Sequence, residues 1–181
     1  MSNVGTDFFV FTGGPGAGKT SVVNALAKRG EAVTTEAGRA VIARHAAAGL
    51  PPPYADPAAF AGLMLEADIA EYERAMALTG RVFFDRGVPD LLGYLKLMGL
   101  PAAERFRQAA LDYRYAPKVF VFPPWRAIYV QDRERHQDFA EAARTWEMMV
   151  CAYDSLGYEL VEIPQASVEA RVEFILAAIG A

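Results

Sequence analysis

The sequence contains a single cysteine, Cys151, so no disulfide can form within the chain. This favours a reducing compartment, and Cys151 is expected to be a small buried residue of a helix. The N-terminal residues lack the basic stretch of a signal peptide, and no apolar run reaches the ~20 residues that a bilayer crossing requires. We therefore expect a cytoplasmic protein without a membrane partner.

Basic residues are also few. Lys and Arg number 18 against 22 Asp and Glu, which gives a net charge of -4 at pH 7. A general nucleic-acid binder usually carries a basic face, so we expect no nucleic-acid partner. The chain has 181 residues, of which 53% are hydrophobic, and this is enough to bury a core in a single domain over residues 1–181. The oligomeric state cannot be predicted from these features.

Five short β-rich runs alternate with helical patterns. Strands are expected at residues 8–12, 32–35, 81–84, 118–122 and 159–163. Helices are expected at residues 20–28, 37–48, 57–78, 102–113, 138–156 and 168–179. Strands that alternate with helices predict an α/β fold with a parallel sheet.

The most specific pattern is the loop of residues 13–20. It reads Gly-Gly-Pro-Gly-Ala-Gly-Lys-Thr and meets G-x-x-x-x-G-K-[ST] in full, between a predicted strand and a predicted helix. Glycines let backbone N–H groups approach phosphate oxygens, and the helix N-terminus adds a partial positive charge. The expected phosphate-binding residues are Gly13, Gly14, Pro15, Gly16, Ala17, Gly18, Lys19, Thr20 and Ser21.

Two side chains of this loop have defined expected roles. Lys19 should reach the β- and γ-phosphates of a nucleotide, and the Thr20 hydroxyl should ligate Mg²⁺. The Asn-Lys-x-Asp guanine motif is absent, which argues against a GTPase switch. The loop therefore predicts binding of a nucleoside triphosphate, ATP, together with Mg²⁺.

The third predicted strand ends in a carboxylate. The run Val82-Phe83-Phe84-Asp85 has the form of a Walker B strand, whose carboxylate holds a Mg²⁺-bound water beside the phosphates. The alternative is an ordinary strand that ends in a solvated ion pair with Arg86. Asp85 is thus the second candidate metal residue.

Several motifs together resemble a known family. Asp85-Arg86-Gly87 resembles the Asp-Arg pair of P-loop nucleoside and nucleotide kinases. The wider set is similar to small bacterial AAA-type ATPase or kinase-like proteins related to the nicotinamide riboside kinase domain. The matching segments are residues 9–20, 35–39, 84–90, 123–125, 132–135 and 153–158. The resemblance implies a three-layer P-loop NTPase fold with sheet order 2-3-1-4-5 and an acceptor site over the carboxyl ends of the strands.

Four residues are candidates for the acceptor side. In the kinases that the chain resembles, a Glu at the position of Glu36 accepts the proton of the attacking hydroxyl. The alternative is a helix N-terminal Glu that pairs with a surface Arg39. Arg39 and Arg86 are expected to bind an acceptor phosphate or another polar group. Asp90 is expected to hydrogen-bond a substrate hydroxyl, with a solvated helix position as the alternative.

Residues 123–138 correspond to the lid of the kinases that the chain resembles. The segment carries Arg126, Arg133 and Arg135, whose guanidinium groups would neutralise charge on the transferred phosphoryl group. Arg135 fits the family's Asp-x-Glu-Arg position, so it is the expected catalytic arginine. The alternative is a solvated run of charges.

Large side chains between the second and third predicted strands are expected either in the core or in the wall of an acceptor pocket. Periodicity alone does not separate these two places. The residues are Tyr54, Phe60, Met64, Tyr72 and Met76.

The residues together predict a P-loop phosphotransferase. It would transfer the γ-phosphoryl group of ATP to a hydroxyl or phosphate of a small nucleoside-like or nucleotide-like molecule. Lys19 and Asp85 would serve the donor, and Glu36 and Arg86 the acceptor. Two alternatives stay open: an ATPase that uses water as its acceptor and acts as a switch, and a nucleotide-binding module without catalysis.

Overall fold

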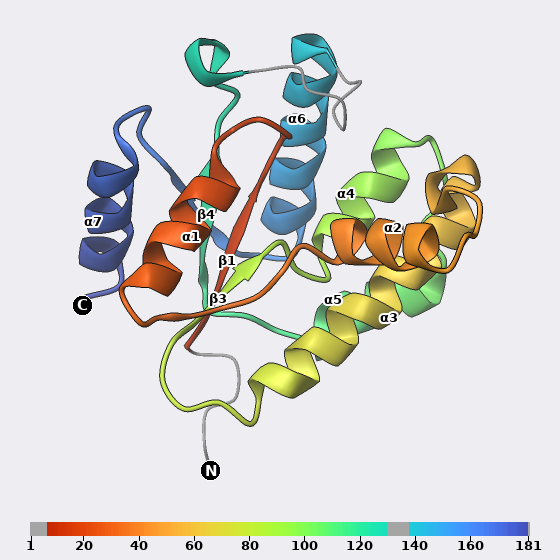
Figure 1. Ribbon diagram of the computed structural model, residues 1–181, viewed down its shortest axis with the longest axis horizontal. Coiled ribbons are helices and arrows are strands. Elements are labelled where there is room, and N and C mark those ends of the chain that lie inside the picture. The colour runs from red at the N-terminus through yellow and green to blue at the C-terminus, as the bar shows by residue number, and fades with distance from the viewer. Residues whose placement is uncertain (1–6, 130–137, 181) are drawn as a thin grey trace.

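The computed structural model describes residues 7–129 and 138–180. A single sheet of parallel strands has the order β2-β3-β1-β4-β5 (Figure 1). This is the order that the family resemblance implies, so the predicted α/β P-loop fold is confirmed. The strands are β1 (Phe8–Gly13), β2 (Ala32–Val33), β3 (Val82–Asp85), β4 (Lys118–Phe122) and β5 (Glu159–Glu162).

Helices lie on both sides of the sheet and form a three-layer domain (Figure 1). None of the helices within residues 7–129 and 138–180 has both the length and the apolar character that a bilayer crossing needs. They are α1 (Lys19–Lys28), α2 (Ala37–Ala47), α3 (Pro57–Ala75), α4 (Asp90–Leu97), α5 (Glu104–Asp112), α6 (Phe139–Ser155) and α7 (Val168–Ala178).

The central strand β1 separates two apolar clusters. Its side chains alternate between the faces of the sheet, as strand geometry requires. Phe9 and Phe11 join residues of α1 and α7 on one face, while Phe8 and Val10 join residues of α3 and α6 on the other. Every residue of β1 is buried, which is typical of a parallel strand that is covered on both sides. A further cluster holds α2, α3, α4 and α5 together beside the sheet.

The parallel arrangement brings the carboxyl ends of the strands to one edge. Phe11 of β1 lies opposite Asp85 of β3, and Gly13 lies opposite Phe122 of β4. The segment after β2 leads directly into α2 at the same edge. The phosphate loop, Asp85 and the start of α2 therefore meet where ligands bind in open α/β sheets.

Some local expectations were wrong. The third predicted helix ends at Ala75 rather than at residue 78, because Met76 and Leu78 are about half exposed and gain no burial from a further turn. Tyr54 is also exposed, whereas Phe60, Met64 and Tyr72 are buried as predicted. Cys151 is exposed on α6, because it lies on the face that turns away from the sheet. The helices predicted from the sequence patterns did not include α4.

Candidate functional site

The phosphate loop connects β1 to α1, as the motif predicts. Gly18 caps α1 with a left-handed backbone, φ 83°, which glycine adopts without a steric penalty. At Gly14 a side chain has no room, because a Cβ there would lie 2.3 Å from the backbone oxygen of Ala142 in α6. The loop can adopt this conformation because both positions are glycine.

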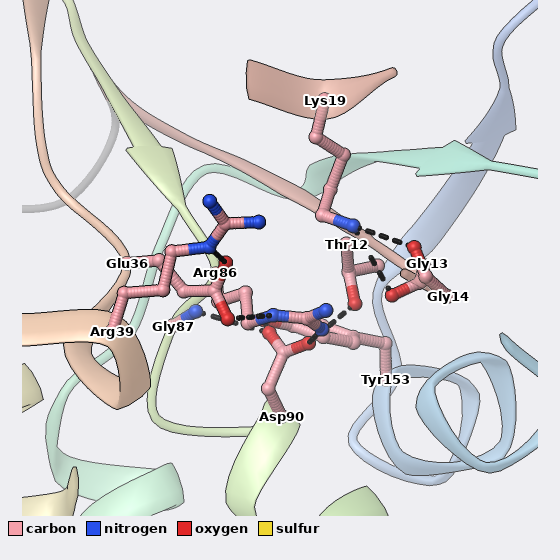
Figure 2. A network of polar contacts seen from close by, with 10 residues as sticks. All are labelled: Thr12, Gly13, Gly14, Lys19, Glu36, Arg39, Arg86, Gly87, Asp90 and Tyr153. Atoms are coloured by element: carbon pink, nitrogen blue, oxygen red, sulfur yellow. Dashed lines mark hydrogen bonds and ion pairs between the residues drawn. The ribbon is translucent and has the colours of Figure 1, made fainter. Parts of the chain in front are cut away.

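Lys19 is buried at the start of α1, and its ammonium group points back into the loop (Figure 2). Its Nζ donates a hydrogen bond to the Gly14 carbonyl oxygen at 2.8 Å and lies 3.4 Å from that of Gly13. Burial, and then the charge of Arg86, lower the Lys19 pKa from 10.5 to about 8. Added negative charge would stabilise the ammonium form.

The loop lines an open cavity of about 480 Å³. Residues from Pro15 through Ser21 border this cavity, and Thr20 and Ser21 are exposed. Gly13 and Gly14 are buried beneath it, where their carbonyl oxygens hold Lys19. Seven of the nine predicted phosphate-binding residues thus face the cavity, and the other two support them.

Asp85 ends β3 as a buried residue, only 5% exposed. Its backbone N–H donates to the Thr34 hydroxyl, while its Oδ1 is buried and has no hydrogen-bond partner. Burial raises the pKa of the Asp85 carboxyl, and the nearby Lys19 opposes this effect. Asp85 forms no ion pair with any described residue, so the alternative of a solvated ion pair does not hold.

An oxygen that is buried without a partner fits a position that a cation complements. Thr20 and Asp85 would hold Mg²⁺ there, the first through its hydroxyl and the second through a bound water. Within the described residues, no group of three or more His, Cys, Asp or Glu side chains could hold a metal ion. Residues of this kind bind Mg²⁺ in company with the oxygens of a nucleotide.

Arg86 follows Asp85 in a left-handed backbone conformation, φ 74°, which costs a non-glycine residue about 1 kcal/mol or more. Its Nη1 lies 3.0 Å from Asp90 Oδ1, and its Nε lies 3.4 Å from Glu36 Oε1 (Figure 2). Burial alone would lower the pKa of Arg86, but Glu36, Asp90 and Asp85 raise it, so the guanidinium stays charged. The strained backbone places this cation between two acids.

Asp90 is the centre of a buried hydrogen-bond network (Figure 2). Oδ1 accepts from the Thr12 hydroxyl at 2.6 Å and from Arg86 at 3.0 Å. Oδ2 accepts from the Tyr153 hydroxyl at 2.6 Å and from the Gly87 N–H at 3.0 Å. The alternative of a solvated helix position is wrong, since Asp90 is 5% exposed. With both oxygens occupied, Asp90 positions Arg86.

Replacing Asp90 by Ala is expected to lower the free energy of unfolding by about 3 kcal/mol, because Arg86 loses a buried acidic partner. For a chain of this length the melting temperature should fall by roughly 10 °C. Tyr153→Phe removes one of the four hydrogen bonds and should cost only about 1 kcal/mol. Calorimetry of the two variants tests this order, and equal melting temperatures for Asp90→Ala and the wild type would contradict it.

Glu36 stands at the N-terminus of α2 but makes no side-chain capping bond. Its Oε2 lies 3.3 Å from Arg39 Nε, the pairing that the structural alternative predicts. Its other oxygen pairs with Arg86, which that alternative does not predict. Burial favours neutral Glu36, but Arg86, Lys19 and Arg39 hold its pKa below the usual value, so the carboxylate stays ionised.

A second cavity, of about 230 Å³, opens beside the phosphate loop. Its walls are mainly apolar side chains of α3, α4 and α6, and its polar residues include Asp68 and Thr145. Glu36, Arg39 and Arg86 border both cavities. The predicted acceptor residues therefore stand at the junction between a phosphate cavity and a mainly apolar one.

Much of the predicted lid lies outside the described residues, including Arg133 and Arg135. Arg126 is described, and its guanidinium carbon lies 4.2 Å from the centre of the Phe139 ring. Arg126 does not border the phosphate cavity. Its expected role at the nucleotide remains a prediction.

Sequence patterns missed four residues of this region: Thr12, Asp68, Tyr153 and Arg171. Thr12 and Tyr153 hold Asp90 from β1 and α6. Arg171 of α7 borders the phosphate cavity, and its Nη1 donates to the Ala17 carbonyl oxygen at 3.4 Å. Only Asp68 had a local signal, since it interrupts a row of apolar residues spaced by four on α3.

Comparison with solved structures relates the fold to NadR and to a deoxyadenosine kinase and a thymidylate kinase. NadR in complex with NR superposes with a TM-score of 0.74 at 18% identity over 97% of this chain, and NadR with NAD and AMP-PNP gives 0.71 at 18%. The chain spans about half the length of these NadR chains, 51% and 50%.

Two further similar structures match over nearly their whole length. A deoxyadenosine kinase from M. mycoides with bound dATP has a TM-score of 0.59 at 12% identity, over 96% of this chain and 99% of that one. A thymidylate kinase from Ehrlichia chaffeensis has 0.59 at 14%, over 98% and 100%. The TM-scores show that these proteins share the fold of this chain.

A comparison with curated protein sequences finds no match. A family model described as an AAA domain, AAA_28, matches residues 8–171, from the first strand through the phosphate loop to α7. The match covers the large majority of the chain. The chain therefore belongs to this family of AAA domains with a P-loop kinase-like fold.

Proposed function

We propose that this protein is an ATP-dependent kinase of a small nucleoside-like or nucleotide-like molecule. The observation that carries the proposal is the junction of the two cavities at Glu36, Arg39 and Arg86. An enzyme that uses water as its acceptor has no need for a second, mainly apolar cavity beside the phosphates. A kinase needs one, because it must bind its acceptor and exclude water from the transferred group.

On the donor side, the loop from Pro15 to Ser21 would receive the triphosphate. Lys19 would turn from the loop carbonyls toward the β- and γ-phosphates, whose charge stabilises its ammonium form. Mg²⁺, held by Thr20 and Asp85 when bound, would neutralise charge on the phosphate oxygens. A similar structure, NadR with NAD and AMP-PNP, holds an analogue of ATP, which supports ATP as the donor.

On the acceptor side, Glu36 would accept the proton of the attacking hydroxyl, because it remains ionised at neutral pH and borders both cavities. Arg86 would orient the acceptor or its phosphate, with Asp90 fixing the guanidinium. Arg39 is about half exposed and would contact the acceptor at the outer rim. A cytoplasmic location, where ATP is abundant, belongs to this proposal.

The test is a phosphoryl-transfer assay with ATP, Mg²⁺ and a panel of nucleosides and nucleoside monophosphates. Products are identified by mass spectrometry, and ADP formation is followed in parallel. A phosphorylated acceptor supports the kinase. ADP formation that is indifferent to every acceptor would instead support the ATPase alternative, and binding of ATP without any turnover would support the non-catalytic module.

Asp85→Asn is expected to raise the Mg²⁺ concentration needed for half-maximal activity by roughly 10–100-fold, as loss of an outer-shell metal partner does. The fold should survive, because Asp85 Oδ1 has no protein partner to lose. A Mg²⁺ titration of initial rates measures the effect. Asp112→Asn, an exposed change on α5, is the control, and an unshifted titration for Asp85→Asn would remove Asp85 from the metal site.

A further inference from the structure

Helix α3 presents a row of side chains to the interior at every fourth position. Phe60, Met64 and Tyr72 in this row are 6%, 8% and 4% exposed. Asp68 occupies the position between Met64 and Tyr72, where an apolar side chain would continue the row. A carboxylate at a core-facing position lowers stability unless another group compensates it.

The Asp68 carboxylate has no direct polar partner among the residues that the structure describes. Its side chain makes no hydrogen bond or ion pair with any described residue, although it borders the second cavity. The two arginines of that cavity are engaged elsewhere, Arg39 with Glu36 and Arg86 with both Glu36 and Asp90. The cavity therefore contains one acidic side chain in excess of its ion pairs.

The electrostatic surroundings of Asp68 also favour an external partner. Burial, and then the negative charge of Asp90, raise the pKa of Asp68 well above its usual value. Glu36 and Glu71 act in the same direction, Arg86 opposes them, and the Tyr115 hydroxyl is near enough to respond to Asp68. A ligand that offers an N–H donor or a positive charge would relieve this unfavourable position.

The walls around Asp68 suit a flat ring. Phe60 and Tyr94 meet edge to face with their ring centres 5.9 Å apart, and both border the cavity. Met64 and Met149 add polarisable thioethers to the lining. Asp68 borders only this cavity, whereas Glu36 and Arg86 also border the phosphate cavity. Asp68 thus belongs to the part of the pocket that recognises the acceptor rather than to the part that receives phosphate.

We propose that Asp68 is a specificity-determining residue that selects acceptors whose heteroaromatic ring carries an exocyclic amino group, as in an aminated nucleoside. The inference rests on the proposed function in taking the second cavity as the acceptor pocket. The ring lies against Phe60 and Tyr94 and donates an exocyclic N–H to the carboxylate. Rings that present a carbonyl oxygen there meet repulsion from the carboxylate and bind more weakly.

The experiment compares nucleosides that differ in one group, with binding measured by calorimetry in the presence of AMP-PNP. Cytidine is paired with uridine, and adenosine with inosine, so that an amino group replaces a carbonyl. The wild type is expected to bind the amino member of at least one pair about tenfold or more tightly. Asp68→Asn, whose amide also donates, should reduce this preference by about tenfold or reverse it. Asp154→Asn, an exposed change on α6, should retain it.

Three results would overturn the proposal: a wild type that prefers the carbonyl members, one that binds each pair equally or not at all, or an Asp68→Asn variant that keeps the wild-type preference. Binding does not depend on turnover. A preference that requires Asp68 without any phosphoryl transfer would therefore support Asp68 as the specificity residue while contradicting the proposed kinase. Circular dichroism confirms beforehand that Asp68→Asn is folded.

Discussion

Lys19→Ala is expected to weaken ATP binding by on the order of 100-fold, because a charged hydrogen-bond donor to phosphate contributes about 1.5–3 kcal/mol. The fold should be retained or become more stable. In the free protein the Lys19 ammonium is buried, and that burial, rather than a stabilising ion pair, dominates the shift of its pKa to about 8. The variant therefore separates nucleotide binding from folding, which calorimetry with AMP-PNP and thermal unfolding measure independently.

Lys28→Ala provides the matched control, since Lys28 ends the same helix on its exposed side. It removes the same charge from α1 and should leave the affinity for AMP-PNP unchanged. If Lys19→Ala bound the nucleotide as tightly as Lys28→Ala, the phosphate loop would not be the nucleotide site. A large loss of stability in Lys19→Ala would show instead that its bonds to Gly13 and Gly14 hold the loop together.

Glu36→Gln is expected to lower kcat for phosphoryl transfer by about 10²–10⁴-fold, the usual contribution of a general base, with little change in the KM for ATP. The amide matches the carboxylate in size but cannot accept the proton of the acceptor hydroxyl. Glu36 is suited to this task because its pKa is held below the usual value, so that it is ionised throughout the neutral range. Steady-state rates with a phosphorylated acceptor from the panel measure the change.

Glu147→Gln, an exposed change on α6, serves as the control for Glu36→Gln. A structural role of Glu36 as a partner of Arg39 and Arg86 would raise the KM for the acceptor and leave kcat nearly unchanged. That outcome would assign Glu36 to positioning. A loss confined to kcat supports the role as base.

Local sequence patterns predicted the conformation of the phosphate loop well, because the loop is made of consecutive residues. The spacing from Gly13 to Thr20 predicts a turn that leads into the start of a helix, and both are present. Asp85 was found for a similar reason, since a buried parallel strand must end at the edge where β1 also ends. The strand order itself came from the family resemblance.

The acceptor side depended on contacts between distant segments, which a local pattern does not contain. Asp90 is predicted to contact a substrate hydroxyl, and it borders the second cavity. The local pattern did not reveal its buried hydrogen bonds to Thr12 and Tyr153, which lie 78 and 63 residues away in sequence. Arg171 reaches the loop from the opposite end of the chain. The exposure of Cys151 also depends on which face of α6 meets the sheet, and that is decided by tertiary packing.

The left-handed backbone of Arg86 has a consequence for any attempt to engineer a more heat-resistant form of this protein. Glycine at this position would relieve the backbone by only about 1 kcal/mol. The same change would remove the cation that links Glu36 to Asp90. Because the buried Asp90 and the partly buried Glu36 would then lose this partner, which costs about 3 kcal/mol or more, Arg86→Gly should lower both stability and acceptor binding. A stabilised variant is better sought on exposed helix surfaces far from this edge of the sheet.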